Sequence, residues 1–197
     1  MRSRSEVLEL AVLGLLHSAP MHGYELRKRL NEMLGPLRAF SYGSLYPCLR
    51  DLAGRGLIAS SRTDPEIATA LAAKRGKIVY RLTGEGEAAF ESMLGEAGPA
   101  SWEDENFDVR FAFFAQTDPE TRLRVLEGRR IRMAERYDAL RTSMTRTPSA
   151  DPYLTELHRH GLDQVEREVR WLDDLIDAER GARRASRRAR RATGPPG

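Results

Sequence analysis

A short stretch from Ser41 to Arg50 holds the residue types best suited to contact a large polar surface. Apolar residues recur within it at helical spacing and predict one buried stripe, formed by Tyr42, Leu45, Leu49 and Leu52. The opposite face of the same helix carries small, polar or cationic residues, namely Gly43, Ser44, Pro47, Arg50 and Gly54. Small side chains leave a helix backbone approachable, and the major groove of DNA is a surface that such a helix can enter.

Pro47 restricts where this helix begins, because a proline deep inside a helix loses a hydrogen bond and clashes with the preceding turn, at a cost of roughly 3 kcal/mol. A start at Ser44 puts Pro47 among the free N–H positions of the first turn, whereas a start at Ser41 sacrifices one bond. The sequence leaves both starts open. Either one brings free N–H groups and the positive end of the helix dipole to residues 41–44, an arrangement suited to a phosphate.

Two helices are predicted upstream, over residues 5–18 and about 22–34, and together with the helix at 44–53 they form a helix-turn-helix core. Two short strands follow, at about 57–61 and 77–82. The residues between these strands are too many for a tight hairpin and predict a wing. Its return side carries three cations, Lys74, Arg75 and Lys77, which are placed to meet phosphates or a minor groove. Thr83 is the expected N-cap of a fourth helix, which ends near residues 95–99.

Two sequence strings resemble the PadR family of bacterial transcriptional regulators. The first is Ser41-Tyr42-Gly43-Ser44-Leu45-Tyr46-Pro47, followed by Leu49, Leu52 and Gly56-Leu57-Ile58, and the second is Met21-His22-Gly23-Tyr24-Glu25-Leu26. The resemblance covers about residues 7–95. It implies a DNA-binding winged helix and small aromatic or drug-like effectors.

The residues expected to contact DNA are His22, Tyr24, Ser41, Tyr42, Gly43, Ser44, Tyr46, Pro47, Arg50, Lys74, Arg75 and Lys77. Backbone N–H and hydroxyl groups of the serines and Gly43 would bind phosphates, and Arg50 would reach a phosphate or a guanine. Tyr42 has two open roles, since it also fits the buried stripe. His22 is either a contact to the DNA backbone or a solvated residue at the start of the second helix.

Charge is distributed unevenly along the chain, although the net charge is only +3. Residues 1–83 sum to +6, residues 84–180 to −9 and residues 181–197 to +6. An acidic middle between two basic ends indicates that only parts of the molecule face a polyanion. The cations comprise 29 Arg and 3 Lys, a bias that a GC-rich genome would also produce, so part of this argument is discounted.

The fold predicted from these patterns is mainly α with a small β-wing: a winged helix-turn-helix over residues 1–97, a helical dimerisation domain over 98–180 and a disordered arginine-rich tail over 181–197. Residues 102–116 are predicted to be helical, and Asp118-Pro119 and Asp151-Pro152 are start signals for two more helices. Their apolar seams require a helical partner, which we expect to be a second copy of the chain. The predicted dimer interface consists of Leu123, Leu126, Leu162, Val165, Val169, Leu172 and Ile176.

Aromatic residues of the second domain have two interpretations. They either line an effector pocket, as the family resemblance implies, or they form ordinary core at helical spacing. The candidate pocket residues are Trp102, Phe107, Phe111, Phe114, Tyr137 and Trp171.

Catalytic and metal sites are not expected. The sequence has no glycine-rich phosphate loop, nucleophile elbow or zinc-type cysteine spacing. His158 and His160 are two residues apart on a helix and point away from each other. Cys48 is either a redox sensor or a small semi-buried residue. We therefore predict a non-enzyme without a cofactor or metal.

The absence of apolar runs near 18 residues argues against a membrane partner. A signal peptide is also disfavoured, because Glu6 and Glu9 interrupt the apolar run that follows Arg2 and Arg4. The single cysteine fits a reducing compartment, so we expect a bacterial cytoplasmic protein that joins the nucleoid when bound to DNA.

The sequence thus predicts a DNA-binding transcriptional regulator, a homodimer that represses from an inverted-repeat operator and is released by a small aromatic or drug-like effector. Two alternatives stay open: a winged-helix module that binds another protein, and a small-molecule binding protein without DNA specificity.

Overall fold

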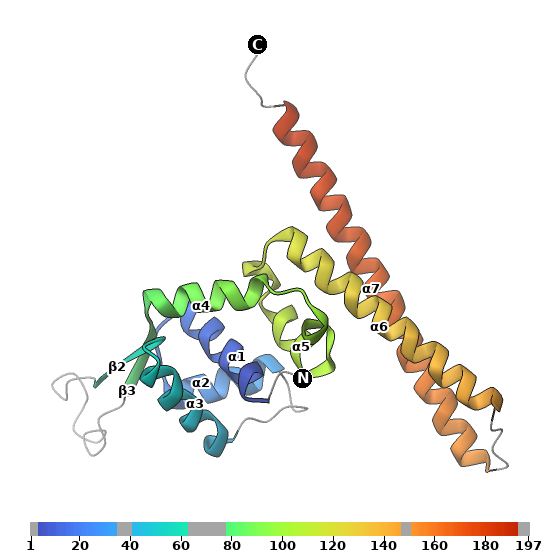
Figure 1. The fold of residues 1–197 in the computed structure, drawn as a ribbon, viewed down its shortest axis with the longest axis horizontal. Coiled ribbons are helices and arrows are strands. Elements are labelled where there is room, and N and C mark those ends of the chain that lie inside the picture. Colours follow the sequence, from blue (N-terminus) through green and yellow to red (C-terminus); the bar gives the residue numbers. More distant parts are fainter. Residues whose placement is uncertain (1–3, 35–40, 63–77, 147–150, 193–197) are drawn as a thin grey trace. The chain divides into compact units, whose positions relative to one another are not determined.

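The computed structural model describes residues 4–34, 41–62, 78–146 and 151–192 (Figure 1). The chain forms two compact units. Unit 1 comprises Met1–Glu96 and Asp104–Thr117, and unit 2 comprises Ala97–Glu103 and Asp118–Gly197. The sequence predicts one boundary near residue 97, whereas the chain passes between the units three times.

Unit 1 has five α-helices and three strands in its described part: α1 (Arg4–Ser18), β1 (Met21–His22), α2 (Gly23–Leu34), α3 (Tyr42–Gly54), β2 (Ile58–Arg62), β3 (Ile78–Leu82), α4 (Gly84–Gly95) and α5 (Asp104–Ala112). The strands form one antiparallel sheet in the order β1-β3-β2, with Met21 opposite Tyr80 and Ile58 opposite Leu82. The two predicted wing strands are confirmed within one residue at each end. The short strand β1 was not predicted, and it takes His22 out of the helix in which the sequence analysis put it.

Helix α1 is the centre of the unit 1 core. It contacts α2, α3, α4, α5 and β3 (Figure 1), and these elements together bury most of its apolar side chains. Leu26 and Leu30 of α2 and Leu45, Leu49 and Leu52 of α3 complete this core. The predicted N-cap of α4 is also confirmed, because the N–H of Gly86 donates to Thr83 Oγ1 at 3.1 Å.

Residues 104–117 belong to the unit 1 core. Val109 and Phe113 are buried in the same cluster as α1, and the ring of Phe113 meets that of Phe90 edge-on with 5.6 Å between centroids. Gly14 lies so close to Phe113 that a Cβ there would overlap the ring. Because of this packing, residues 104–117 group with unit 1, although the sequence predicts the domain boundary near residue 97. The helix predicted over 102–116 is also interrupted, because short 3-10 turns, η3 (Pro99–Trp102) and η4 (Phe114–Gln116), flank α5.

Unit 2 is a helical hairpin of α6 (Pro119–Arg146) and α7 (Pro152–Ala192), which run side by side in opposite directions (Figure 1). Both predicted start signals are confirmed: Asp118 Oδ1 accepts from the N–H groups of Glu120 and Thr121 at 2.9 Å, and Asp151 Oδ1 accepts from that of Tyr153 at 2.9 Å. The predicted disorder from Gly181 is wrong as far as Ala192, since α7 continues to that residue. Arg and Ala dominate this segment and are strong helix formers. Among the described helices, none is long and apolar enough to cross a membrane.

Candidate nucleic-acid interface

The start of α3 is fixed by Ser41. Its hydroxyl accepts from the N–H of Ser44 at 3.3 Å, and the hydroxyl of Ser44 donates back to the Ser41 carbonyl at 3.0 Å. Of the two starts that the sequence leaves open, the structure has the one at Ser41, so Pro47 lies inside the helix and costs one hydrogen bond. The N–H groups of Tyr42 and Gly43 have no protein partner in the described chain.

The predicted amphipathic character of α3 is confirmed with one exception. Leu45, Leu49 and Leu52 are buried, and the small and polar residues opposite them are exposed. Tyr42 is 44% exposed, so it lies outside the buried stripe. This excludes the buried role, and the contact of Tyr42 with DNA stays a prediction.

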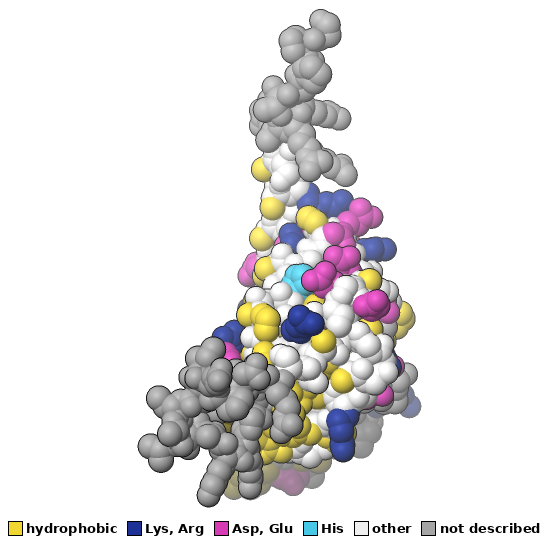
Figure 2. All heavy atoms as spheres, turned by 90° about the vertical axis from the view of Figure 1, so that its left-hand side faces the viewer, with side chains coloured by type: hydrophobic (Ala, Val, Ile, Leu, Met, Phe, Trp, Pro, Cys, Tyr) yellow, Lys and Arg dark blue, Asp and Glu magenta, His cyan; other side chains and the backbone are white. Residues whose placement is uncertain are grey.

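Three exposed tyrosines lie on α2 and α3. Tyr24 is the most exposed at 62%, and the rings of Tyr42 and Tyr46 stack with 5.9 Å between centroids and 21° between planes. Gly23 begins α2 directly beside Tyr46, where a Cβ would come within 3.2 Å of the phenol oxygen. A glycine at that position therefore lets the two helices approach each other closely. Figure 2 shows hydrophobic side chains gathered beside the grey segments, with Lys and Arg side chains distributed singly around them.

The cations near α2, α3 and β3 differ in their partners. Lys28, Arg29 and Arg55 bind carboxylates: Lys28 Nζ lies 3.7 Å from Glu32, Arg29 donates to Glu25 at 2.8 Å, and Arg55 donates to Glu9 at 2.8 Å and to Asp51 at 3.1 Å. Arg50 and Arg81 are exposed and have no carboxylate partner in the described chain. Arg27 lies over an aromatic ring, that of Tyr42. The sequence analysis identified Arg50 but missed Arg27 and Arg81, because spacing alone does not reveal which cations are paired.

Arg55 links the end of α3 to α1. Hydrogen bonds from Glu9 and then Asp51 raise the pKa of its guanidinium. The bidentate contact with Glu9 joins residues 46 positions apart and holds the C-terminal end of α3 against the core helix.

Cys48 faces the interior of unit 1. Burial, followed by the negative charges of Glu9 and Asp51, raises its pKa to about 12. The thiol is therefore protonated at neutral pH, which favours the plain structural interpretation over a redox sensor.

His22 connects two strands of the sheet. It pairs with Val79 in the β1–β3 ladder, and its Nδ1 lies 3.2 Å from the carbonyl oxygen of Ile78. The ring therefore holds the base of β3. Lys74, Arg75 and Lys77, the predicted wing cations, lie outside the described residues.

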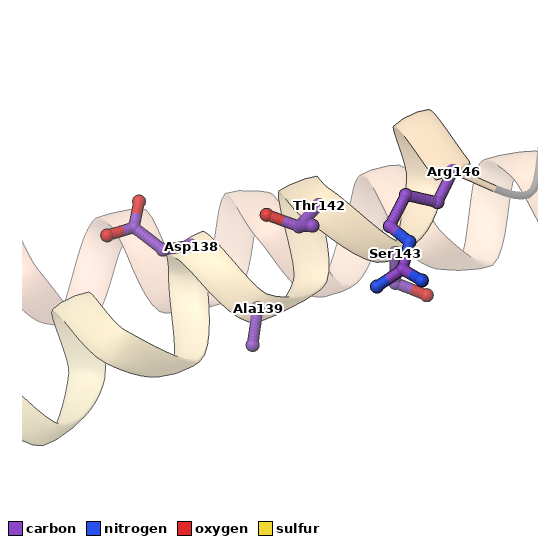
Figure 3. Close-up of a pocket in the computed structure, with 5 residues that line it drawn as sticks. All are labelled: Asp138, Ala139, Thr142, Ser143 and Arg146. Carbon is purple, nitrogen blue, oxygen red and sulfur yellow. The ribbon is translucent and has the colours of Figure 1, made fainter.

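The six candidate pocket aromatics are divided between the units. Phe107, Phe111 and Phe114 belong to unit 1 and form a row of rings with centroids 5.8 and 5.0 Å apart. Trp102, Tyr137 and Trp171 belong to unit 2, where the Trp102 indole fills the space beside Gly128. Two cavities of unit 2 have other linings. One of about 580 Å³ is bordered by α6 alone, through Asp138, Ala139, Thr142, Ser143 and Arg146 (Figure 3), and one of about 420 Å³ is bordered by charged residues of α6 and α7.

The predicted dimer residues are used largely within one chain. Leu126, Val165, Leu172 and Ile176 are buried between α6 and α7, and the other three, Leu123, Leu162 and Val169, are half-buried. Apolar exposure is found instead at Tyr153, Leu154 and Leu157 at the start of α7, where Tyr153 is 85% exposed.

Comparison with known protein families gives a match over part of the chain. Residues 12–92 match the transcriptional regulator PadR-like family. The chain is similar to Bacillus subtilis PadR solved in complex with operator DNA, at 21% identity over 88% of this chain and 99% of that one, with a TM-score of 0.41. It is similar to the same protein in complex with p-coumaric acid, at 20% identity over 88% and 98%, with a TM-score of 0.39. It also resembles the PadR-like transcriptional regulator BC1756 from Bacillus cereus, at 20% identity over 89% and 99%, with a TM-score of 0.37. No curated protein matches the chain.

Proposed function

We propose, from the match of residues 12–92 to the transcriptional regulator PadR-like family, that the protein reads a specific operator in double-stranded DNA with α3 and represses transcription from it. The observation that carries the proposal is the composition of the exposed face of α3. That face presents the exposed Ser44 hydroxyl together with two N–H groups and the guanidinium of Arg50, which have no partner among the described residues, on a helix whose other face is anchored in the core.

Each exposed group has a role that suits DNA. The free N–H groups of Tyr42 and Gly43, with the positive end of the helix dipole, would bind a phosphate. Arg50, about two turns further on, would enter the major groove and bind a guanine or a second phosphate. Tyr24 and Tyr46 would pack against the DNA backbone.

The protein would act as a homodimer joined through unit 2. Tyr153, Leu154 and Leu157 give α7 an exposed apolar face, and half-buried Leu162 continues it one turn further. Two-fold symmetry of such a dimer demands an inverted-repeat operator with half-sites one or more helical turns apart. Replacing Leu157 by Glu should convert the dimer to monomers, as measured by light scattering. The fold should survive, because this side chain is exposed in the single chain. If the Leu157→Glu variant stays dimeric, the dimer interface lies elsewhere.

A small aromatic effector completes the proposal. It would release the operator only if it bound one arrangement of the dimer better than the other. The two tryptophans, Trp102 and Trp171, both lie in unit 2, so their fluorescence reports on that unit alone. Quenching by hydroxycinnamic or other aromatic acids, together with release of operator at the same concentrations, is the expected result. Release without quenching would favour the phenylalanine row of unit 1.

Selection of bound sequences from a random DNA pool tests the whole proposal. We expect an inverted repeat bound by two chains, with an affinity that falls as salt rises. Failure of a folded dimer to enrich any sequence would contradict operator reading and favour a module that binds another protein. The regulator would work in the bacterial cytoplasm, where its operator lies.

A further inference from the structure

Arg27 of α2 and two tyrosines of α3 form a stack that connects the helices. The guanidinium carbon of Arg27 lies 4.1 Å from the centroid of the Tyr42 ring, and that ring stacks on Tyr46. The ring face attracts the cation and keeps the guanidinium above the Tyr42 ring. Arg27 is therefore held by the same helix that we propose enters the groove.

The charge of Arg27 has no acidic partner in the described chain. Its neighbours on α2 differ, because Lys28 and Arg29 each bind a glutamate one turn away. Arg27 Nε is buried without a hydrogen-bond partner, and the side chain as a whole is half-buried. A guanidinium has five N–H donors, and a ring face uses none of them in hydrogen bonds. The outer donors of Arg27 are thus available for an anion.

The position of Arg27 on α2 indicates which anion it would meet. In helix-turn-helix proteins the first helix of the motif crosses the DNA backbone while the second lies in the major groove. A planar guanidinium matches a phosphate bidentately. We propose that Arg27 is a phosphate-binding residue of the DNA interface and that Tyr42 positions it as an aromatic platform, an inference that rests on the proposed function.

This assignment gives Tyr42 a defined task. Its ring supports Arg27, and its hydroxyl is not required for that support. The proposal therefore predicts that Phe can replace Tyr42 and that Ala cannot. It also predicts that Arg27 strengthens binding to every DNA sequence equally, because phosphates carry no sequence information.

The test measures binding of the full-length protein to the selected operator and to a scrambled duplex by fluorescence anisotropy over a range of salt concentrations. In R27Q the aliphatic stem is kept and the charge is removed. We expect the slope of log K against log salt to fall by about one. The loss of affinity should be the same on both duplexes. R29Q on the same helix is the matched control, and its slope should equal that of wild type, because Arg29 is already paired with Glu25.

Two tyrosine variants separate a platform from a direct contact. Y42F should bind like wild type, whereas Y42A keeps the charge of Arg27 without its platform and should fall between R27Q and wild type, and the double variant R27Q/Y42A should be no weaker than R27Q. R27K keeps the charge without the planar stack and should fall between R27Q and wild type.

Several outcomes would overturn the proposal. An R27Q protein with wild-type slope on an operator that wild type binds well would show that Arg27 contacts no phosphate and would leave the proposed function intact. Loss on the operator alone would make Arg27 a base reader instead. A wild-type protein that binds neither duplex would remove the proposed function and this inference together.

Discussion

Arginine side chains have different partners in the two units. On the hairpin of unit 2 they bind carboxylates across the helix pair: Arg122 binds Glu179 at 2.9 Å, Arg130 binds Asp173 at 3.0 Å and Arg180 binds Glu127 at 2.8 Å. Around α3 of unit 1, Arg50 and Arg81 have no carboxylate partner among the described residues, and Arg27 has only a ring. Arginine therefore joins the two helices of unit 2, whereas these three arginines of unit 1 are left available for a ligand, although Arg55 of the same unit binds Glu9 and Asp51.

Helix starts differ between the units in the same way. Unit 2 caps α6 and α7 with the carboxylates of Asp118 and Asp151. Unit 1 caps α3 with the hydroxyl of Ser41, and the first turn of α3 contains no acidic residue. A carboxylate cap neutralises the positive end of the helix dipole, whereas a hydroxyl leaves it open. The comparison teaches that the surface we propose for DNA differs from unit 2 in what is left unpaired, which net charge does not report.

The largest effect is expected from removing two exposed polar side chains of α3. Ser44→Ala combined with Arg50→Ala should abolish specific operator binding, a loss of at least about thirtyfold, because each good contact contributes about 1–3 kcal/mol. Anisotropy with the selected operator measures the loss, and light scattering should show an intact dimer.

Arg159→Ala in unit 2 is a suitable control for that double variant, since Arg159 is exposed and paired with Glu156. Unchanged operator affinity in the Ser44 and Arg50 double variant would contradict the assignment of α3 as the reader. A similar loss in the Arg159 variant would remove the distinction between paired and unpaired arginines.

The sequence predicted local features of the fold better than the long-range contacts between them. The α3 stripe, the two wing strands and the caps at Thr83, Asp118 and Asp151 follow from local spacing and capping chemistry, and the structure confirms them. The grouping of residues 104–117 with unit 1 depends on Phe113 meeting α1, a long-range contact that no local pattern reveals. Likewise, Leu126 and Leu172 have the spacing of a dimer seam, and only the structure shows that each chain buries its own.

The sequence indicates candidate site residues where they belong to a family motif or lie on one face of a predicted helix. Arg27 was missed because its role depends on a ring fifteen positions away, and Tyr42 was ambiguous because helical spacing does not fix exposure at a helix end. The ion pairs of Lys28 and Arg29 have the i,i+4 spacing that a sequence shows, whereas the pair between Arg55 and Glu9 joins residues 46 positions apart and is seen only in the structure.

A second prediction tests the paired side of the comparison with two adjacent residues of α6. Arg129 is 6% exposed and donates to Glu168 Oε1 and to the carbonyl of Trp102, whereas Arg130 is 43% exposed in its pair with Asp173. Arg129→Ala should lower the free energy of unfolding by about 2–4 kcal/mol, because it leaves a largely buried carboxylate and a carbonyl unpaired. Arg130→Ala should cost about 0–1 kcal/mol. Urea denaturation measures both, and equal losses would show that burial does not distinguish these pairs.

A third prediction exchanges the type of helix cap. Ser41→Asp would keep the cap of α3 and add a negative charge at its start, so thermal stability should hold or rise slightly. Operator affinity should fall about tenfold at low salt, because the new carboxylate repels the phosphate expected there. Ser41→Asn is the matched control, since it caps equally well without charge. Wild-type affinity in Ser41→Asp would show that no phosphate approaches this end of α3.

The smallest effect concerns the carboxylate cap of α6. Hydrogen bonds from the hydroxyl and N–H of Thr121, and from the N–H of Glu120, lower the pKa of Asp118 below its ordinary value of 3.8. A carboxyl group whose pKa is lowered in the folded state stabilises the fold above its unfolded pKa, and that stabilisation is lost as the pH falls through the folded pKa. Asp118→Asn keeps a cap but removes the charge, so it should cost a few tenths of a kcal/mol at pH 7 by the helix-dipole argument. The difference in unfolding free energy between wild type and this variant should shrink below about pH 4, where Asp118 begins to be protonated in the unfolded chain. If the difference in unfolding free energy stays constant from pH 7 to pH 3, the cap at Asp118 acts through hydrogen-bond geometry alone. The contrast with the uncharged start of α3 would then concern ligand access and not helix stability.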